Sequence, residues 1–201
     1  MTQPSVATRP LHPADGALYD VTILTGFLWG VELVNAFIFG GRLDAYGIAP
    51  RNFTGIPGIL VWPFLHAGFA HLIANTLPFL VLGTIVRLGG RGAFIAVSMV
   101  ITIGAGALVW LLARPGIVVG ASGLIFGWFG YIVSDAVHSR RAIRLLAAAG
   151  VVLIYGPAIL FGFIPGFGHV SWEAHLAGFA AGWIAGRSLA GRRDTTTPSP
   201  G

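Results

Sequence analysis

The sequence predicts an all-α membrane protein with six transmembrane helices. Hydrophobic residues make up 55% of its 201 residues, whereas Asp, Glu, Lys and Arg together make up 9%, against about a quarter in soluble domains. Long stretches lack any charged residue: 35 positions between Arg51 and Arg87, and 28 between Arg144 and Glu173. Because a membrane-spanning helix needs roughly 20 apolar residues, such stretches fit transmembrane segments and argue against a water-soluble domain.

Six apolar segments follow one another along the chain. They cover residues 21–40, 67–86, 93–113, 117–137, 143–164 and 171–190. The long connection over residues 41–66 is too polar and too rich in proline and glycine to span, so we expect it to lie on the surface. We therefore predict an N-terminal tail over residues 1–20, one membrane domain over residues 21–190, and a disordered C-terminal tail over residues 191–201.

The placement of the arginines predicts the orientation in the membrane. All twelve basic residues are arginines; nine fall on the side that holds both termini, and three, Arg42, Arg51 and Arg114, fall on the other. Because arginine is enriched in cytoplasmic loops, we expect a multi-pass protein of the cell membrane with both termini in the cytoplasm; an organelle inner membrane is the alternative. Arginines clustered between apolar segments favour the lipid bilayer as a partner and argue against nucleic acid. The sequence predicts no particular oligomeric state.

Polar side chains gather where the second, fourth and sixth segments begin, which is at the outer face. His71 and Asn75 lie four residues apart, on one face of the second segment. Ser122 opens the fourth segment, and His175 lies near the start of the sixth. Each has a simpler explanation alone, as a backbone-bonded serine, an interfacial histidine or an asparagine that links helices. Together they supply a nucleophile, a base and hydrogen-bond donors at one level.

This set of side chains points to serine-based acyl transfer. A neutral His175 would take the proton of Ser122 Oγ and return it to the leaving amine. The Ser122 backbone N–H, the Asn75 amide and a His71 ring nitrogen would stabilise the oxyanion. Asp135 lies roughly 20 Å along the helix from Ser122, and Glu173 lies on the opposite side of its helix from His175. We therefore predict a dyad rather than a triad.

No metal or other cofactor is expected. The sequence contains no cysteine, which excludes cysteine-ligated metals and a thiol nucleophile.

Glycines predict that the fourth and sixth segments touch. Gly178 and Gly182 follow His175 on one helical face, and Gly123 begins a similar ridge next to Ser122. Small residues let membrane helices approach closely, so these ridges would bring Ser122 and His175 together. In the first segment, Glu32 and Asn35 lie one turn apart. We expect them to bond to each other or to a neighbouring helix rather than to take part in catalysis.

These motifs resemble those of the rhomboid family of intramembrane serine proteases. Residues 63–75 resemble the family's second span, residues 120–123 its nucleophile motif, and residues 174–182 its sixth span with the catalytic histidine. The resemblance implies a six-helix rhomboid-like bundle in which Ser122 is the nucleophile and His175 the base. It further implies an oxyanion hole made by His71, Asn75 and the Ser122 amide, with Gly120, Gly123, Phe126, Gly178 and Gly182 as supporting residues.

The resemblance also implies the substrates, which would be transmembrane proteins with small residues at the cleavage point. They would enter past the fifth span and a mobile loop over residues 162–168. Phe126 stands where the family often has a tyrosine that stacks on the histidine, and residues 43–51 replace the family's Trp-Arg pair. His66 resembles a histidine that braces a loop, and His169 is expected to face solvent.

Two other functions stay open at this point. A catalytically silent family member would bind and retain membrane proteins, but the intact serine, histidine and oxyanion residues argue against it. A small transporter would more usually place its polar groups near the midplane and on broken helices, whereas these groups lie at one outer level.

Overall fold

All regular structure in the described part of the chain is helical. The computed structural model describes residues 12–165 and 171–194. Within these ranges the elements are α1 (Pro13–Phe37), η1 (Arg42–Tyr46), η2 (Phe53–Gly55), α2 (Gly58–Val61), η3 (Trp62–Phe64), α3 (Phe69–Leu88), α4 (Arg91–Leu112), α5 (Ser122–Ser139), α6 (Ala142–Gly162) and α7 (Trp172–Asp194). The prediction of an all-α protein is confirmed for these residues.

Each of the six predicted apolar segments corresponds to one long helix, although the two outermost ends differ and α5 begins at Ser122 rather than near residue 117. α1 begins at Pro13 rather than near residue 21, because the His12 side chain accepts a hydrogen bond from the Ala14 amide and a proline suits the first helical position. α7 continues to Asp194, beyond the expected end at residue 190. The remainder of both predicted tails lies outside the described residues.

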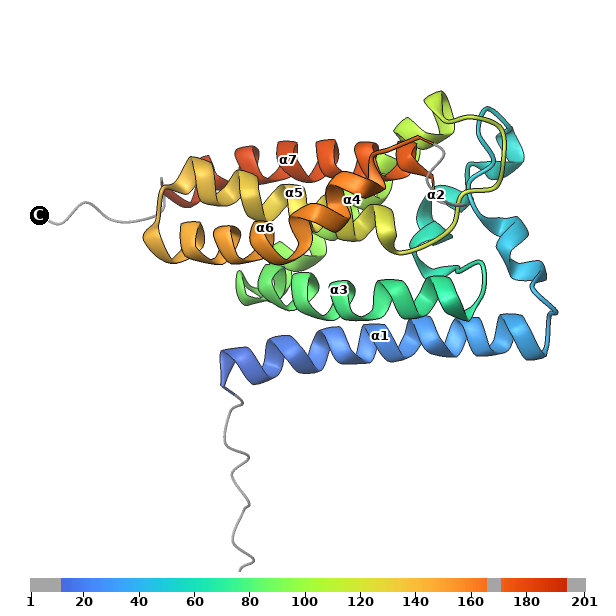
Figure 1. The fold of residues 1–201 in the computed structure, drawn as a ribbon, viewed down its shortest axis with the longest axis horizontal. Helices are drawn as coiled ribbons and strands as arrows, with labels where there is room; N and C mark the ends of the chain where they lie inside the picture. The colour runs from blue at the N-terminus through green and yellow to red at the C-terminus, as the bar shows by residue number, and fades with distance from the viewer. Residues whose placement is uncertain (1–11, 166–170, 195–201) are drawn as a thin grey trace, which may run out of the picture.

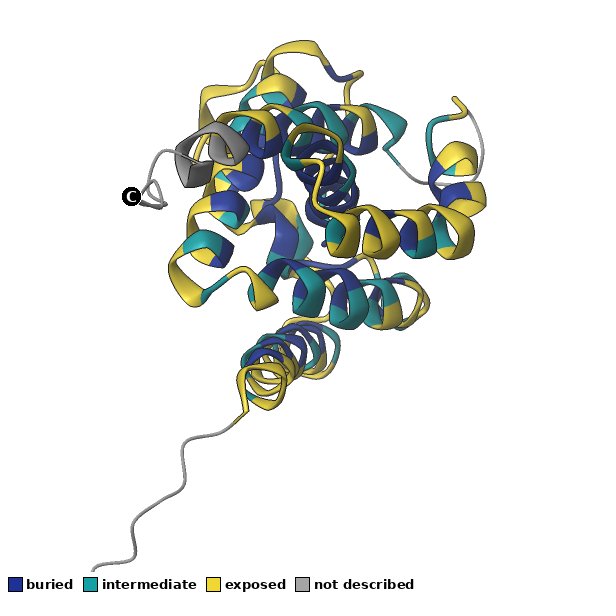
Figure 2. Cartoon of the chain, turned by 90° about the vertical axis from the view of Figure 1, so that its left-hand side faces the viewer, coloured by how far each residue is buried: buried dark blue, intermediate teal, exposed yellow. Residues whose placement is uncertain are grey.

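Four of the long helices are long and apolar enough to cross a membrane. These are α1, α3, α4 and α6. The predicted number of six spans is thus confirmed for four helices and not for α5 and α7. α5 is enclosed by its neighbours, with 13 of its 18 residues buried (Figure 2), so its polar side chains contact protein rather than lipid.

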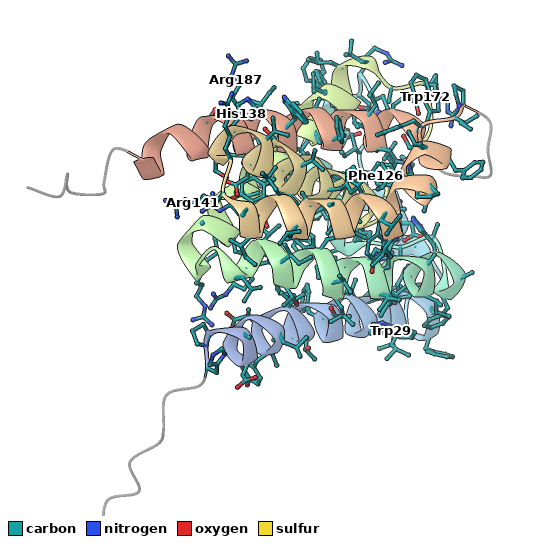
Figure 3. All side chains as sticks on the ribbon, turned by 60° about the vertical axis from the view of Figure 1, so that its left-hand side comes forward. Trp29, Phe126, His138, Arg141, Trp172 and Arg187 are labelled. Atoms are coloured by element: carbon teal, nitrogen blue, oxygen red, sulfur yellow. The ribbon has the colours of Figure 1, made fainter. Side chains whose placement is uncertain are left out.

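The helices run side by side as a bundle with two distinct ends. α1 begins and α7 ends at one end, which we call the terminal end, and α3, α5 and α7 all begin at the opposite end, which we call the site end (Figure 1). His138, Arg141 and Arg187 lie toward the terminal end, whereas Trp29 and Trp172 lie toward the site end (Figure 3). Three segments distant in the sequence therefore place their first turns close together.

Ion pairs join neighbouring helices at the terminal end. Asp20 of α1 accepts hydrogen bonds from Arg87 at 2.7 Å and from Arg91 at 2.5 Å. Asp135 of α5 pairs with Arg144 of α6 at 2.9 Å. Asp135 is thus bound to an arginine, which agrees with the prediction that it takes no part in catalysis.

α5 and α7 pack backbone against backbone, and we call this contact the α5–α7 seam. A Cβ atom added to Gly178 would overlap the carbonyl oxygen of Gly123, and one added to Gly182 would overlap that of Gly127. Only glycine fits at these two positions of α7. The close approach is of the kind that small residues allow between membrane helices, and it aligns the first turns of the two helices.

The expectation that residues 41–66 lie on the surface is wrong for part of this segment. Ile48, Trp62 and His66 are fully buried. Trp62 Nε1 donates to the Thr102 carbonyl of α4 at 3.3 Å. Gly106 of α4 leaves the room for this packing, since a Cβ there would come within 2.8 Å of the Ile59 side chain. The segment therefore supports the site end from within the bundle.

Candidate active site

Ser122 and His175 meet at the site end of the α5–α7 seam. Ser122 is the first residue of α5, and His175 lies in the first turn of α7. His175 Nε2 is 2.9 Å from Ser122 Oγ, and the histidine is 4% exposed. Helix packing thus places a serine hydroxyl within hydrogen-bonding distance of a buried imidazole.

A backbone carbonyl determines which nitrogen of His175 carries the proton. His175 Nδ1 lies 2.8 Å from the carbonyl oxygen of Gly162, the last residue of α6. A carbonyl oxygen can only accept, so Nδ1 is the donor, and Nε2 of the neutral ring is left to accept the Ser122 hydroxyl. Sequence reasoning missed this partner, because no side-chain pattern marks a carbonyl that orients a histidine.

The ring of His175 is also held from one face. Phe126 of α5 stacks on it, with ring centroids 3.9 Å apart and an interplanar angle of 10°. Gly162 fits closely beside both rings, since a Cβ there would overlap Phe126 and come within 3.0 Å of His175 Nδ1. The hydrogen bond to the Gly162 carbonyl therefore fixes the rotation of the imidazole within its own plane, and the stacked Phe126 ring fixes the tilt of that plane.

His71 and Asn75 lie on the first turns of α3 and face the same cavity as Ser122. His71 Nε2 is buried without a hydrogen-bond partner in the described residues. Its ring packs on Gly120, where a Cβ would come within 2.8 Å of Nε2. Asn75 Nδ2 donates to the His71 carbonyl at 3.1 Å, which uses one of its two hydrogens. Neither side chain is hydrogen-bonded to Ser122.

Two residues of the buried loop hold the segment that leads into α5. The Gly120 amide donates to the Trp62 carbonyl at 2.9 Å, and the Ala121 amide donates to His66 Nε2 at 3.3 Å. Burial, together with the neighbouring His71, lowers the pKa of His66 to about 4, so its ring stays neutral and able to accept. Trp62 was not among the predicted residues, and its only sequence signal is a large aromatic residue in a short apolar stretch, residues 58–65, of the connection.

Glu173, the acidic residue near the site, and Asp135, at the terminal end, both have other partners. Glu173 accepts from Ser171 Oγ at 3.2 Å and pairs with Arg114 at 3.4 Å, and Asp135 pairs with Arg144. Among the described residues no group of three or more His, Cys, Asp or Glu side chains could hold a metal ion. His169 and residues 166–168 of the predicted mobile loop lie outside the described residues.

Two cavities meet at Ser122 and His71. The larger measures about 320 Å³ and lies between α3, α5 and α6; apart from the site residues its walls are apolar, with Pro78, Leu82, Ile125, Tyr155, Ala158 and Ile159 among them. The smaller measures about 90 Å³ and reaches Ser122 from the side of Ser171 and residues 117–119. The hydroxyl is thus accessible from an apolar side and from a narrow second side.

Several known proteins are similar to this sequence over most of its length. A model of the rhomboid domain matches residues 56–192. An uncharacterized protein of Mycobacterium tuberculosis is 38% identical over 175 residues, which cover 82% of this chain and 72% of the relative. RHOMBOID-like protein 1 of Arabidopsis thaliana is 35% identical over 151 residues, covering 73% of this chain and 37% of the relative.

A relative whose name states an activity is the Rhomboid protease GluP of Bacillus subtilis. It is 30% identical over 126 residues, which cover 62% of this chain and 24% of that protein. The domain match and these relatives confirm the resemblance that the three motifs indicated, and the apolar helices agree with a multi-pass membrane protein. The chain belongs to the rhomboid family of intramembrane proteases.

Proposed function

We propose that this protein is an intramembrane serine endopeptidase that hydrolyses a peptide bond in or near the transmembrane segment of another membrane protein. The observation that carries the proposal is the orientation of His175. Its Nε2 faces Ser122 Oγ at 2.9 Å while its Nδ1 is bonded to the Gly162 carbonyl. A neutral, correctly oriented imidazole beside a serine hydroxyl is the arrangement that general-base activation of a nucleophile requires.

The reaction proceeds in two halves through Ser122. In the first, Oγ attacks the substrate carbonyl carbon while its proton passes to His175 Nε2; the tetrahedral intermediate then collapses, and Nε2–H gives that proton to the leaving amine. In the second, a water molecule gives a proton to Nε2 and attacks the acyl carbon, and the proton returns to Oγ as the carboxylic acid leaves. Gly162 keeps Nδ1 protonated throughout, as a carboxylate does in a triad.

The oxyanion would lie between the start of α5 and the first turns of α3. Its donors are the Ser122 amide, His71 Nε2 carrying a proton, and the second hydrogen of the Asn75 amide. The buried and unpartnered Nε2 of His71 supports this assignment, because a buried polar atom without a partner is costly unless a ligand completes its hydrogen bond. Gly120 allows the His71 ring to approach this point.

The two cavities suit the two reactants. The apolar cavity of about 320 Å³ between α3 and α6 fits a substrate segment that comes from lipid. The smaller cavity of about 90 Å³ has mostly polar walls and the dimensions of a few water molecules. We propose that substrate approaches Ser122 from the first cavity and water from the second.

We further propose that α5 and α7 cross the membrane inside a bundle of six spans, with both termini in the cytoplasm and the site end at the outer face. The arginine distribution supports this orientation. Because the chain has no cysteine, single introduced cysteines would report it without background. Thr54→Cys, at the site end, should react with an impermeant maleimide in intact cells, whereas Ser188→Cys, toward the terminal end, should react only after lysis; the opposite pattern would reverse the topology.

Cleavage of a model transmembrane substrate by purified protein in liposomes tests the proposed activity. Wild type should release a product, and Ser122→Ala and His175→Ala should not. A fluorophosphonate probe should label wild type at Ser122 and leave His175→Ala unlabelled. Equal rates in wild type and both variants would reject the dyad. Absence of both cleavage and labelling would instead favour a silent family member that binds membrane proteins.

Replacing Asn75 by alanine tests the oxyanion assignment. One oxyanion donor contributes about 2.7–4 kcal/mol to transition-state stabilisation, so Asn75→Ala should lower kcat by about 10²–10³-fold while the protein still folds. Unchanged turnover would remove Asn75 from the site.

A further inference from the structure

Helix α1 contains none of the proposed catalytic groups, yet it packs on the turn that begins α3. The match to the rhomboid domain starts at residue 56, so α1 lies outside it. Trp29 and Phe37 of α1 both pack on Phe69, the first residue of α3, with ring centroids 6.2 Å apart in each pair. Trp29 Nε1 also donates to Thr76 Oγ1 at 3.1 Å. α1 therefore contacts the two turns of α3 that carry His71 and Asn75.

A buried carboxyl group lies in this contact. Glu32 is 3% exposed, and its Oε2 atom has no hydrogen-bond partner in the described part of the chain. The backbone N–H of Gly68 and the side chain of Asn35 both interact with its carboxyl group. A carboxyl group buried at this depth calls for a specific role.

The position of Gly68 explains what that role is. Gly68 is the N-cap of α3 and has φ +92°, and as a glycine it has no side chain to cap the helix. In a capping box, a Glu or Gln at the third helical position bonds back to the N-cap N–H. The third position of α3 is His71, whose ring faces the site, so the helix cannot supply this acceptor itself. The carboxyl group of Glu32 in α1 lies beside the Gly68 N–H, at the positive end of the α3 dipole, where it can supply this acceptor.

We propose that Glu32 is a positioning residue that caps α3 from a neighbouring helix and so fixes His71 for oxyanion stabilisation. The link is short, because the amides of His71 and Leu72 donate to the Gly68 carbonyl at 3.1 and 3.2 Å. When Gly68 moves, the first hydrogen bonds of the helix move with it. The proposal rests on the proposed protease function, where a misplacement of about 1 Å can lower the rate roughly 10²-fold.

Asn35 holds the Glu32 carboxyl in place. Its Oδ1 accepts from the Leu43 amide at 3.0 Å, which fixes the orientation of the amide group, and its Nδ2 donates to Asp44 Oδ1 at 3.0 Å. The same NH₂ group faces Glu32. The amide hydrogens of Asn35 therefore lie between the carboxyl groups of Glu32 and Asp44. This arrangement favours a structural role for the two carboxyl groups over the binding of a cation.

Substitutions at Glu32 distinguish the hydrogen bond from the charge. Glu32→Ala removes the acceptor and should lower kcat at least tenfold with KM nearly unchanged. Glu32→Gln keeps an acceptor oxygen and should retain half of the activity or more. Glu32→Asp keeps the charge but is one methylene too short to reach Gly68, so it should resemble Glu32→Ala. Thr25→Val is the matched control, since Thr25 is a buried polar residue of α1 that bonds only within its own helix, to the Val21 carbonyl.

Two further measurements separate positioning from a general loss of structure. In a His71→Ala background, Glu32→Ala should lower kcat less than twofold further, because both changes act on the same group. Hydrogen exchange of the amides of residues 68–72 should speed up in Glu32→Ala and not in Thr25→Val. If Glu32→Ala does not fold, the contrast between Glu32→Gln and Glu32→Asp carries the same comparison.

The outcomes are distinct for the two proposals. Wild-type exchange rates at residues 68–72 in Glu32→Ala would overturn the cap, whether or not the protein cleaves anything. An equal loss of kcat with and without His71 would overturn the catalytic consequence and leave the cap. Absence of cleavage by wild type would reject the proposed function, while the exchange measurement would still decide the cap.

Discussion

The α5–α7 seam and helix α6 differ in how tightly they pack, although both border the site. On α7, a Cβ at Gly178 or Gly182 would overlap a backbone carbonyl of α5. On α6, a Cβ at Gly150 would meet none of the described atoms within 4 Å, and one at Gly156 would meet only Val152 of its own helix, at 3.6 Å. One side of the site is thus fixed by backbone contact, whereas the other borders a cavity of about 320 Å³.

This difference matches the two tasks of an intramembrane protease. The proposed proton transfer between Ser122 and His175 would need a fixed distance, and the seam provides one. Admission of a substrate would need a side that can give way, and the polar contacts of α6 with its neighbours lie near its ends, between Arg144 and Asp135 and between the Gly162 carbonyl and His175. A rigid half and a loosely packed half are therefore combined around one hydroxyl group.

Gly182→Ala should have the largest effect. The added methyl group would meet the Gly127 carbonyl, and because that obstacle is backbone, the two helices must separate. Overpacking costs about 1–3 kcal/mol and occasionally more, and we expect the upper end, with loss of cleavage. Thermal unfolding in detergent and cleavage assays measure both effects.

Gly150→Ala is the matched control on α6. It adds the same methyl group to open space within a helix, where alanine is favoured over glycine by about 0.5–1 kcal/mol. Its stability should equal or exceed that of wild type. Equal destabilisation by the two substitutions would contradict the contrast between the seam and α6.

The seam is also the part of the fold that the sequence predicted best. The spacing of Gly178 and Gly182 after His175 predicted a contact with the fourth segment, since small-residue ridges have a helical period that can be counted. The burial of Trp62 and His66 was not predictable in the same way. The packing of Trp62 needs a glycine of α4, Gly106, which contacts the loop only once the bundle has formed.

The stability of the site end should depend on pH through His66. Its pKa in the folded protein is about 4, below the usual 6.5, so the unfolded chain takes up a proton first as pH falls. The contribution of His66 to the free energy of unfolding is therefore greatest above pH 6.5. It falls by up to about 3 kcal/mol between about pH 6.5 and 4. His66→Gln keeps an acceptor but does not titrate, so its unfolding temperature should fall less over this range. If the unfolding temperatures of wild type and His66→Gln fall equally with pH, His66 is not the group responsible.

Phe126→Ala tests which half of the site orients His175. The stacked ring belongs to α5 and the carbonyl partner to α6. A stacked aromatic pair contributes about 0.5–1.5 kcal/mol beyond its buried area, so kcat should fall up to about tenfold, whereas Phe126→Tyr should retain activity. Full activity of Phe126→Ala would mean that the Gly162 carbonyl alone orients the ring, and the loosely packed half would then control the base.

The role of Gly162 marks the limit of what the sequence shows about the site. Ser122, His175, His71 and Asn75 were found because their side chains are polar in apolar segments. Gly162 acts through a carbonyl group that every residue has, and Glu32 acts on a backbone amide 36 positions away. Neither partner leaves a pattern in the sequence, because the contacts depend on how α6 and α1 pack.

A pair of matched substitutions should show the smallest effect and test the contrast most directly. Ile101→Val and Ile159→Val each remove one methyl group, which costs about 0.5–1.5 kcal/mol in protein cores. The Ile101 side chain of α4 packs against Gly127, a residue of the seam, whereas Ile159 of α6 lines the cavity. In a bilayer, transfer from water contributes little, because lipid surrounds the helices in the separated state as well. The cost that remains is the loss of van der Waals contacts between the deleted methyl group and its neighbours. Ile101→Val should therefore destabilise by about 1 kcal/mol more than Ile159→Val, and equal values in detergent unfolding would mean that α6 packs as tightly as the seam.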